Sequence, residues 1–114
     1  MLGRMNARSS VAVAEEVGRD ADLPALAEVF GLLADPGRLR ILLTLRAGEA
    51  NVGQLSEASG LSESAASHAL GLLRARQVVQ VRRAGRLAIY RLADKHVRHL
   101  LDTALDHLRH TGDR

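Results

Sequence analysis

A tight turn between two helical patterns constrains the fold of this chain more than any other feature. Capping residues and apolar spacing predict a short helix from Asn51 to Ser59 and a longer one over about 62–76. Between them, Gly60 suits the end of a helix and Ser62 suits the start of the next. Two helices joined by so short a turn are typical of a helix-turn-helix.

The apolar period then changes from that of a helix to that of a strand. Val79 and Val81 alternate with polar residues, and Leu87 and Ile89 do the same after a turn over residues 83–86. Two short strands joined by such a turn form a hairpin. Because a hairpin directly after a helix-turn-helix is a wing, the predicted fold class is mainly α with a small β-hairpin, a winged helix-turn-helix.

Three further helices complete the predicted domain. The first runs over about 22–34 with Asp22 as its cap, the second begins at Pro36 and ends at Gly48, and the last begins at about Asp94. The apolar stripe of this last helix consists of Val97, Leu100, Leu101, Ala104, Leu105 and Leu108. We expect a mobile N-terminal arm, one domain and a short tail, over residues 1–21, 22–110 and 111–114.

The composition narrows the class of protein. The chain of 114 residues can build one modest core, but only 2% of its residues are aromatic, so aliphatic side chains must fill that core and dimerisation would add stability. It has no cysteine, which excludes disulfides and thiolate zinc sites and fits a cytoplasmic protein. No apolar run approaches the roughly 20 residues of a membrane span, so we expect no membrane association.

Positive charge gathers in the middle of the chain. The net charge of the whole chain is +3, yet residues 62–91 alone hold six arginines and one glutamate, a net charge of +5. A basic surface on a winged helix-turn-helix is typical of DNA binding. The candidate contacts, on the outer side of the second helix and on the wing, are Ser64, Ser67, His68, Arg82, Arg83 and Arg86.

Helical periodicity also assigns an inner side to the second helix of the helix-turn-helix. The residues predicted to face the core are Leu61, Ala65, Ala69, Leu72 and Leu73. The alternative to DNA contact is that the serines only cap helices and that His68 is an ordinary surface residue.

The last helix carries a cluster of side chains that can bind a metal. Asp94, His96, His107 and His110 fall within seventeen residues. His96 and His107 point the same way but lie about 16 Å apart along the helix axis, so one helix cannot bring both to one ion. Asp94 with His96, and His107 with His110, are two half-sites. Two such helices, antiparallel across a two-fold axis, would complete two tetrahedral sites, which predicts a homodimer.

Two other readings of these histidines stay open. Polar residues near the end of a helix are often solvated, and histidine there suits the helix dipole, so the protein could be a metal-independent regulator. A zinc hydrolase is disfavoured because four protein ligands leave no open coordination position. We therefore expect neither an enzyme nor a small organic substrate.

Residues 22–110 resemble the ArsR/SmtB family of winged-helix metal-sensing repressors. The resemblance rests on the stretches LADPGRLRIL, at 33–42, and LSESAASHAL, at 61–70. It continues through RAGR, at 83–86, and YRL, at 90–92, to the spacing of the four candidate metal ligands on the last helix.

The resemblance implies a homodimer, joined through its N- and C-terminal helices, that binds operator DNA when metal-free and releases it when Zn(II) binds. It implies that Asp94 and His96 of one subunit join His107 and His110 of the other. It also implies that His107 donates its second ring N–H to a backbone carbonyl near Gln77. DNA contact is implied for Ser64, Ser67 and His68. Relatives often have glutamine where this chain has Glu63, whose carboxylate should weaken or re-aim a phosphate contact.

The donor set indicates which metal is bound. Three imidazoles and one carboxylate in a four-coordinate site favour zinc, and cobalt(II) would suit the same ligands. Nickel prefers more ligands, and the N-terminal arm has no histidine to supply one. His99, three residues after His96, is either an additional ligand or solvated. Residues 51–55 lack the cysteines that thiolate-type relatives carry there, which disfavours sensing of arsenite, cadmium or lead.

Overall fold

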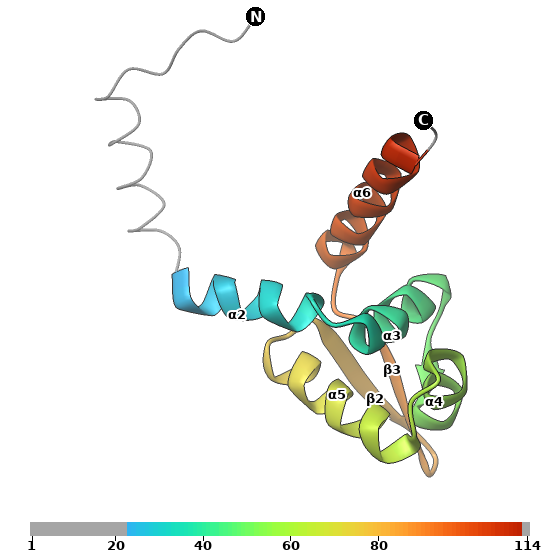
Figure 1. The fold of residues 1–114 in the computed structure, drawn as a ribbon. Coiled ribbons are helices and arrows are strands. Elements are labelled where there is room, and N and C mark those ends of the chain that lie inside the picture. The colour runs from blue at the N-terminus through green and yellow to red at the C-terminus, as the bar shows by residue number, and fades with distance from the viewer. Residues whose placement is uncertain (1–22, 113–114) are drawn as a thin grey trace, which may run out of the picture. The chain divides into compact units, whose positions relative to one another are not determined.

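The structure of the protein, a computed structural model, describes residues 23–112 (Figure 1). The predicted arm over residues 1–21 and its neighbour Asp22 lie outside the described residues. The chain divides into two compact units after Gly31. The elements in order are α2 (Leu23–Leu33), α3 (Pro36–Ala47), β1 (Ala50–Asn51), α4 (Val52–Ser59), α5 (Glu63–Ala75), β2 (Val79–Ala84), β3 (Leu87–Leu92) and α6 (Lys95–Gly112).

Side-chain caps start α3 and α4 where the sequence predicts them. The carboxylate of Asp35 accepts the backbone N–H of Arg38 at 2.9 Å, and proline follows as the first residue of α3. Asn51 and Gln54 form a capping box in which each side chain accepts the other residue's backbone N–H at 2.9 Å.

The turn between α4 and α5 needs glycine at one position. Gly60 has φ +77°, a left-handed conformation that costs other L-residues free energy, and its N–H donates to the carbonyl of Ser56 at 3.0 Å. The hydroxyl of Ser56 donates to the carbonyl of Leu61 at 2.6 Å. Ser62 then caps α5 by accepting the N–H of Ala65 at 3.0 Å. The predicted helix-turn-helix is therefore α4, this turn and α5.

The antiparallel sheet has three strands in the order β1-β3-β2, one more than the predicted hairpin. β2 and β3 pair from Val79–Leu92 to Ala84–Leu87, and Gly85 begins the two-residue turn with φ +64°. The additional strand β1 pairs with residues 89 and 90 of β3. With only two residues, β1 has no periodicity that sequence analysis could detect.

The core is aliphatic, as the composition requires. Its most deeply buried side chains are Ile41, Leu42, Leu45, Leu55, Leu70, Leu73 and Val79. One detail of the predicted core is wrong, since Ala65 and Leu72 are exposed and α5 buries Ala66 and Leu70 instead. Alanine and leucine occupy several sides of α5, so its apolar stripe is wide and its period alone does not determine which edge packs. Among the described residues, no helix is both long enough and apolar enough to span a bilayer.

Candidate DNA-binding surface and metal half-sites

The outer side of α5 is available for contact with a ligand. Ser64, Ser67 and His68 are exposed, and within the described residues their side chains make no hydrogen bond. The exposed methyl of Ala65 lies beside them and offers an apolar contact of the kind that thymine methyl groups make. The structure therefore places the predicted α5 residues on one free surface.

The three arginines of the wing that are predicted to contact DNA differ in their partners. Arg83 and Arg86 are exposed and form no ion pair within the described part of the chain. Arg82, in contrast, pairs with Glu49, which its Nη2 and Nε contact at 3.1 and 3.3 Å. This hydrogen bond lowers the pKa of the Glu49 carboxyl and raises the pKa of the Arg82 guanidinium, so both groups stay charged.

Sequence analysis missed Glu49. It lies 33 residues before Arg82, and only the pairing of the short strand β1 with β3 brings it to the sheet. No local spacing rule connects residues so far apart across a strand that has only two residues.

Asp94 and His96, the first candidate metal half-site, lie together at the start of α6. One carboxylate oxygen of Asp94, Oδ1, accepts the backbone N–H groups of His96 and Val97 at 2.9 and 3.0 Å and so caps the helix. The Nδ1 atom of His96 lies 3.6 Å from the same oxygen. Ligand atoms of a tetrahedral site with bonds near 2 Å are about 3.4 Å apart, so this pair fits a shared ion.

The charge of Asp94 also suits a metal ligand. The N–H of Val97 holds the pKa of the Asp94 carboxyl below its usual value, and His96 adds to this effect. The carboxylate is therefore ionised at neutral pH, the state in which it coordinates a cation.

His107 and His110, the second candidate half-site, lie near the end of α6. Both are exposed and stand at i and i+3, on neighbouring positions of one helix face. No group of three or more His, Cys, Asp or Glu side chains within the described residues of one chain is placed to hold a metal ion.

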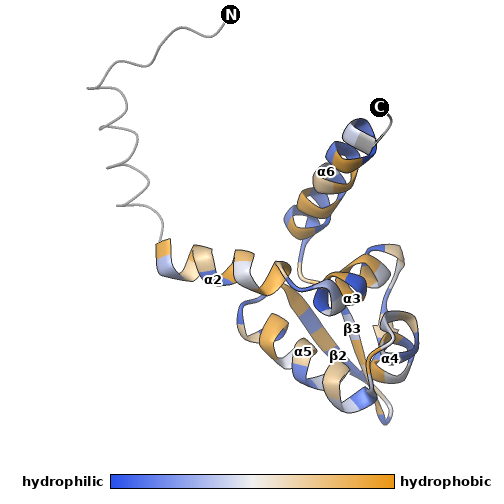
Figure 2. Cartoon of the chain, viewed as in Figure 1, coloured by the Kyte–Doolittle hydropathy of each residue, from blue (hydrophilic) through white to orange (hydrophobic). Residues whose placement is uncertain are grey.

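α6 presents two different apolar surfaces. Leu101 is only 5% exposed and so packs within its own chain, whereas Leu100 and Leu108 are 42% and 64% exposed. Figure 2 shows hydrophobic segments alternating with hydrophilic ones along α6. His96 and His99 border the exposed surface, where they line a pocket with Leu100. The predicted single stripe is therefore divided between the chain's own core and solvent.

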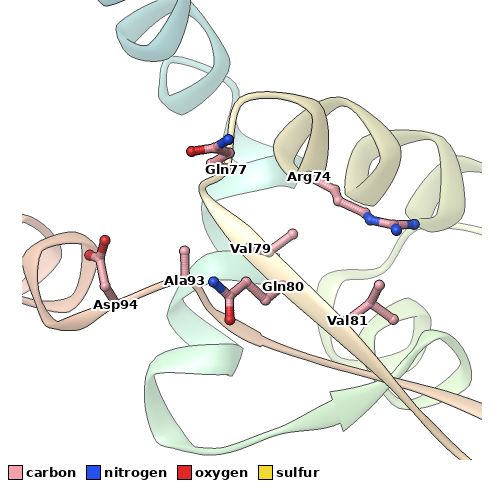
Figure 3. A pocket seen from close by; sticks show the side chains of 7 residues that line it. All are labelled: Arg74, Gln77, Val79, Gln80, Val81, Ala93 and Asp94. Atoms are coloured by element: carbon pink, nitrogen blue, oxygen red, sulfur yellow. The ribbon is translucent and has the colours of Figure 1, made fainter.

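The start of α6 lies close to the end of α5. A shallow pocket of about 480 Å³ lies between them, with Asp94 at one end and Arg74 of α5 at the other (Figure 3). Two backbone hydrogen bonds join the same elements: Val78 N donates to the carbonyl of Leu73 at 2.9 Å, and Ala93 N donates to the carbonyl of Val78 at 3.0 Å. Ala93, the residue before Asp94, is thus linked to Leu73 of α5 through Val78 by two successive backbone hydrogen bonds.

Comparison with known proteins decides the family. Residues 35–80 match the model of the bacterial regulatory proteins of the arsR family. The transcriptional regulator NmtR of Mycobacterium tuberculosis is 46% identical over 85 residues, which cover 75% of this chain and 71% of NmtR. The chain belongs to the ArsR/SmtB family. A transcriptional repressor SmtB homolog of Synechocystis is likewise 46% identical over 84 residues, 74% of this chain, although the match spans only 64% of that relative.

Solved structures of relatives agree in fold. The crystal structure of Rv0081 from M. tuberculosis has a TM-score of 0.74 at 38% identity, over 82% of this chain and 96% of that one. A homodimeric winged helix-turn-helix DNA-binding domain from Mycobacterium bovis has a TM-score of 0.70 at 30% identity, over 96% and 95% of the two chains. The predicted family and fold class are confirmed. The prediction of a non-enzyme is also confirmed, since these relatives are transcriptional regulators.

Proposed function

We propose that this ArsR/SmtB-family protein is a cytoplasmic transcriptional repressor that binds operator DNA as a metal-free homodimer and releases it when Zn(II) binds between the subunits. The observation that carries the proposal is the half-site at the start of α6. There, Asp94 and His96 already lie 3.6 Å apart, close to the spacing that a tetrahedral zinc site requires. Their partners, His107 and His110, are exposed on the same helix.

The DNA-binding surface consists of α5 and the tip of the wing. α5 enters the major groove with Ser64, Ser67 and His68 facing bases and phosphates. Arg83 and Arg86 contact phosphates or the minor groove and make the affinity depend on salt. Both sets of side chains are exposed, which supports this assignment.

The dimer is formed by the apolar surface of α6 together with the N-terminal helix. Leu100, Ala104 and Leu108 are exposed at helical spacing, as expected of a surface that a second copy covers. The M. bovis structural neighbour is homodimeric, which supports a two-fold arrangement. Antiparallel α6 helices bring Asp94 and His96 of each subunit to the other subunit's second half-site.

Zn(II) acts as a charged cross-link between the two α6 helices. Three imidazoles and a carboxylate match the tetrahedral preference of zinc, and cobalt(II) or nickel(II) are the alternatives. Metal binding changes DNA affinity only if the metal favours one dimer geometry over another. The metal site is coupled to the DNA-binding surface by a hydrogen bond. The second ring N–H of metal-bound His107 donates to a backbone carbonyl near Gln77, beyond the end of α5.

The decisive experiment titrates metal into a protein–DNA complex. The metal-free protein is used to select a duplex from a random-sequence pool, and its affinity for that duplex is measured with added zinc, cobalt or nickel. We expect zinc to lower the affinity about 10- to 100-fold with two ions bound per dimer. His107→Asn should bind zinc poorly or bind it without releasing DNA.

His68→Asn is the matched control for this titration. It should weaken DNA binding but retain the response to zinc, because His68 lies on α5 and outside the metal site. If no metal changes the affinity of the wild-type dimer for DNA, the protein is a metal-independent regulator and the sensing proposal is wrong.

A further inference from the structure

The ion pair between Glu49 and Arg82 spans the sheet of the wing. Arg82 pairs in register with Ile89 of β3, and Ile89 pairs with Asn51 of β1, so these three residues form one row across the sheet. Glu49 comes two residues before Asn51. The guanidinium therefore reaches across β3 from one edge strand to the other, over two strand spacings of about 4.8 Å each.

This ion pair lies on the opposite face of β2 from α5. Side chains alternate along a strand, so Val79, Val81 and Arg83 share one face and Arg82 belongs to the other. Val79 is buried in the core that β2 shares with α5. Among the strand arginines, Arg83 is therefore the one on the face of β2 that α5 covers.

We propose that Arg82 is a positioning residue rather than a DNA contact. Its ion pair with Glu49 holds the wing in the position in which Arg83 and Arg86 contact the DNA backbone. The inference rests on the proposed DNA binding and is independent of metal sensing. Arg82 is then no longer among the predicted DNA contacts. Glu49, which sequence analysis did not single out, becomes its partner in positioning the wing.

The chemistry of the pair supports this role. Arg82 donates through two nitrogens to both carboxylate oxygens, at 3.1 and 3.3 Å, the forked geometry in which guanidinium and carboxylate hold each other's direction. A phosphate contact by Arg82 would break both hydrogen bonds. It would also leave the negative charge of Glu49 unpaired close to the negatively charged DNA backbone.

Salt dependence distinguishes a phosphate contact from a positioning residue. The logarithm of the affinity falls linearly with the logarithm of the salt concentration. Each lost phosphate contact reduces the magnitude of this slope by about 0.9, or about 1.8 for a dimer with two wings. We expect Arg83→Gln to show this decrease. Arg82→Gln should lower affinity at every salt concentration and leave the slope unchanged.

Glu49→Gln tests the partner of the pair. It should reproduce the effect of Arg82→Gln, and the double variant should be no worse than either single variant, because both changes break the same contact. The exchanged pair, Glu49→Arg with Arg82→Glu, should restore affinity. All variants are measured as full-length dimers on the same selected duplex.

Three results would overturn the inference. The first is a salt dependence that becomes as shallow for Arg82→Gln as for Arg83→Gln. The second is a Glu49→Gln variant that binds DNA more tightly with a steeper salt dependence. The third is an Arg82→Gln variant with wild-type affinity. In each case the wild-type protein still binds DNA, so the proposed function stands. A wild-type protein that selects no duplex overturns both.

Discussion

Asp94 caps α6 and is also a proposed metal ligand. Its Oδ1 atom accepts the N–H groups that begin α6, and the same carboxylate lies next to the ring of His96. Asparagine caps a helix about as well as aspartate, but its neutral amide is a poor ligand for zinc. Substitution can therefore separate the structural role of this residue from its proposed metal binding.

We predict that Asp94→Asn stays folded without metal, with a slightly lowered melting temperature because the amide keeps the cap but loses the favourable charge, and binds cobalt(II) at least tenfold more weakly. The absorption spectrum of the cobalt complex measures both the affinity and the tetrahedral geometry of the site. Asp106→Asn is the matched control, because Asp106 is also on α6 but pairs with Arg109 at 3.1 Å and has no proposed ligand role. Equal cobalt affinities for the two variants would contradict the assignment of Asp94 as a ligand.

Among the elements, α6 is attached to the winged domain through α3. Arg46, in the last turn of α3, forms an ion pair with Asp102, and Arg98 donates to the backbone carbonyl of Arg46. The hydrogen bond from Arg46 holds the pKa of the Asp102 carboxyl below its ordinary value. These contacts orient the helix that carries the proposed metal ligands and the exposed leucines.

The lowered pKa of Asp102 makes the attachment of α6 dependent on pH. A carboxyl whose pKa is lower in the folded state stabilises the protein above its unfolded pKa, near 4, and this contribution is lost as the pH falls through the folded-state value. Asp94 and Glu49 have lowered pKa values as well, so they act in the same direction.

We therefore predict that Asp102→Asn lowers the melting temperature at pH 7 and makes it fall less steeply between pH 5 and pH 3. Thermal unfolding of the metal-free protein, followed by circular dichroism, measures both effects. Asp106→Asn provides the comparison, since Asp106 pairs with Arg109 of the same helix rather than with a residue of α3. A parallel pH profile for Asp102→Asn and the wild type would show that the ion pair does not anchor α6.

At the scale of the whole molecule, the exposed leucines of α6 connect the proposed dimer with the proposed metal site. A chain of this size that leaves Leu108 64% exposed on a regular helix gains stability when a second copy covers it. Because each proposed site takes ligands from two chains, a monomer would lose metal binding together with the dimer contact.

We predict that Leu108→Glu produces a folded monomer that no longer binds cobalt(II) with a tetrahedral spectrum. Sedimentation measures the mass, and the cobalt spectrum is recorded on the same sample. Arg109→Glu introduces the same carboxylate one residue later, on the charged side of α6, and should remain dimeric. A Leu108→Glu monomer with an intact cobalt site would refute the shared-ligand arrangement.

Much of the architecture could be read from the sequence because its signals are local. The caps at Asp35, Asn51 and Ser62, the left-handed Gly60 and the turn at Gly85 act within a few residues, and the helices and hairpin form where these residues predict them. The two proposed metal half-sites rest on spacing along one helix, since a rise of 1.5 Å per residue keeps His96 and His107 of one chain from sharing an ion.

Other features depended on contacts between residues far apart in the chain. Only the folded structure adds β1 to the sheet and so brings Glu49 to Arg82, and only packing turns Ala66 inward while leaving Ala65 exposed. Packing likewise buries Leu101 within the chain and leaves Leu108 exposed. The period of a helix establishes that apolar residues share a side, but the direction of that side is decided by the elements that pack against it.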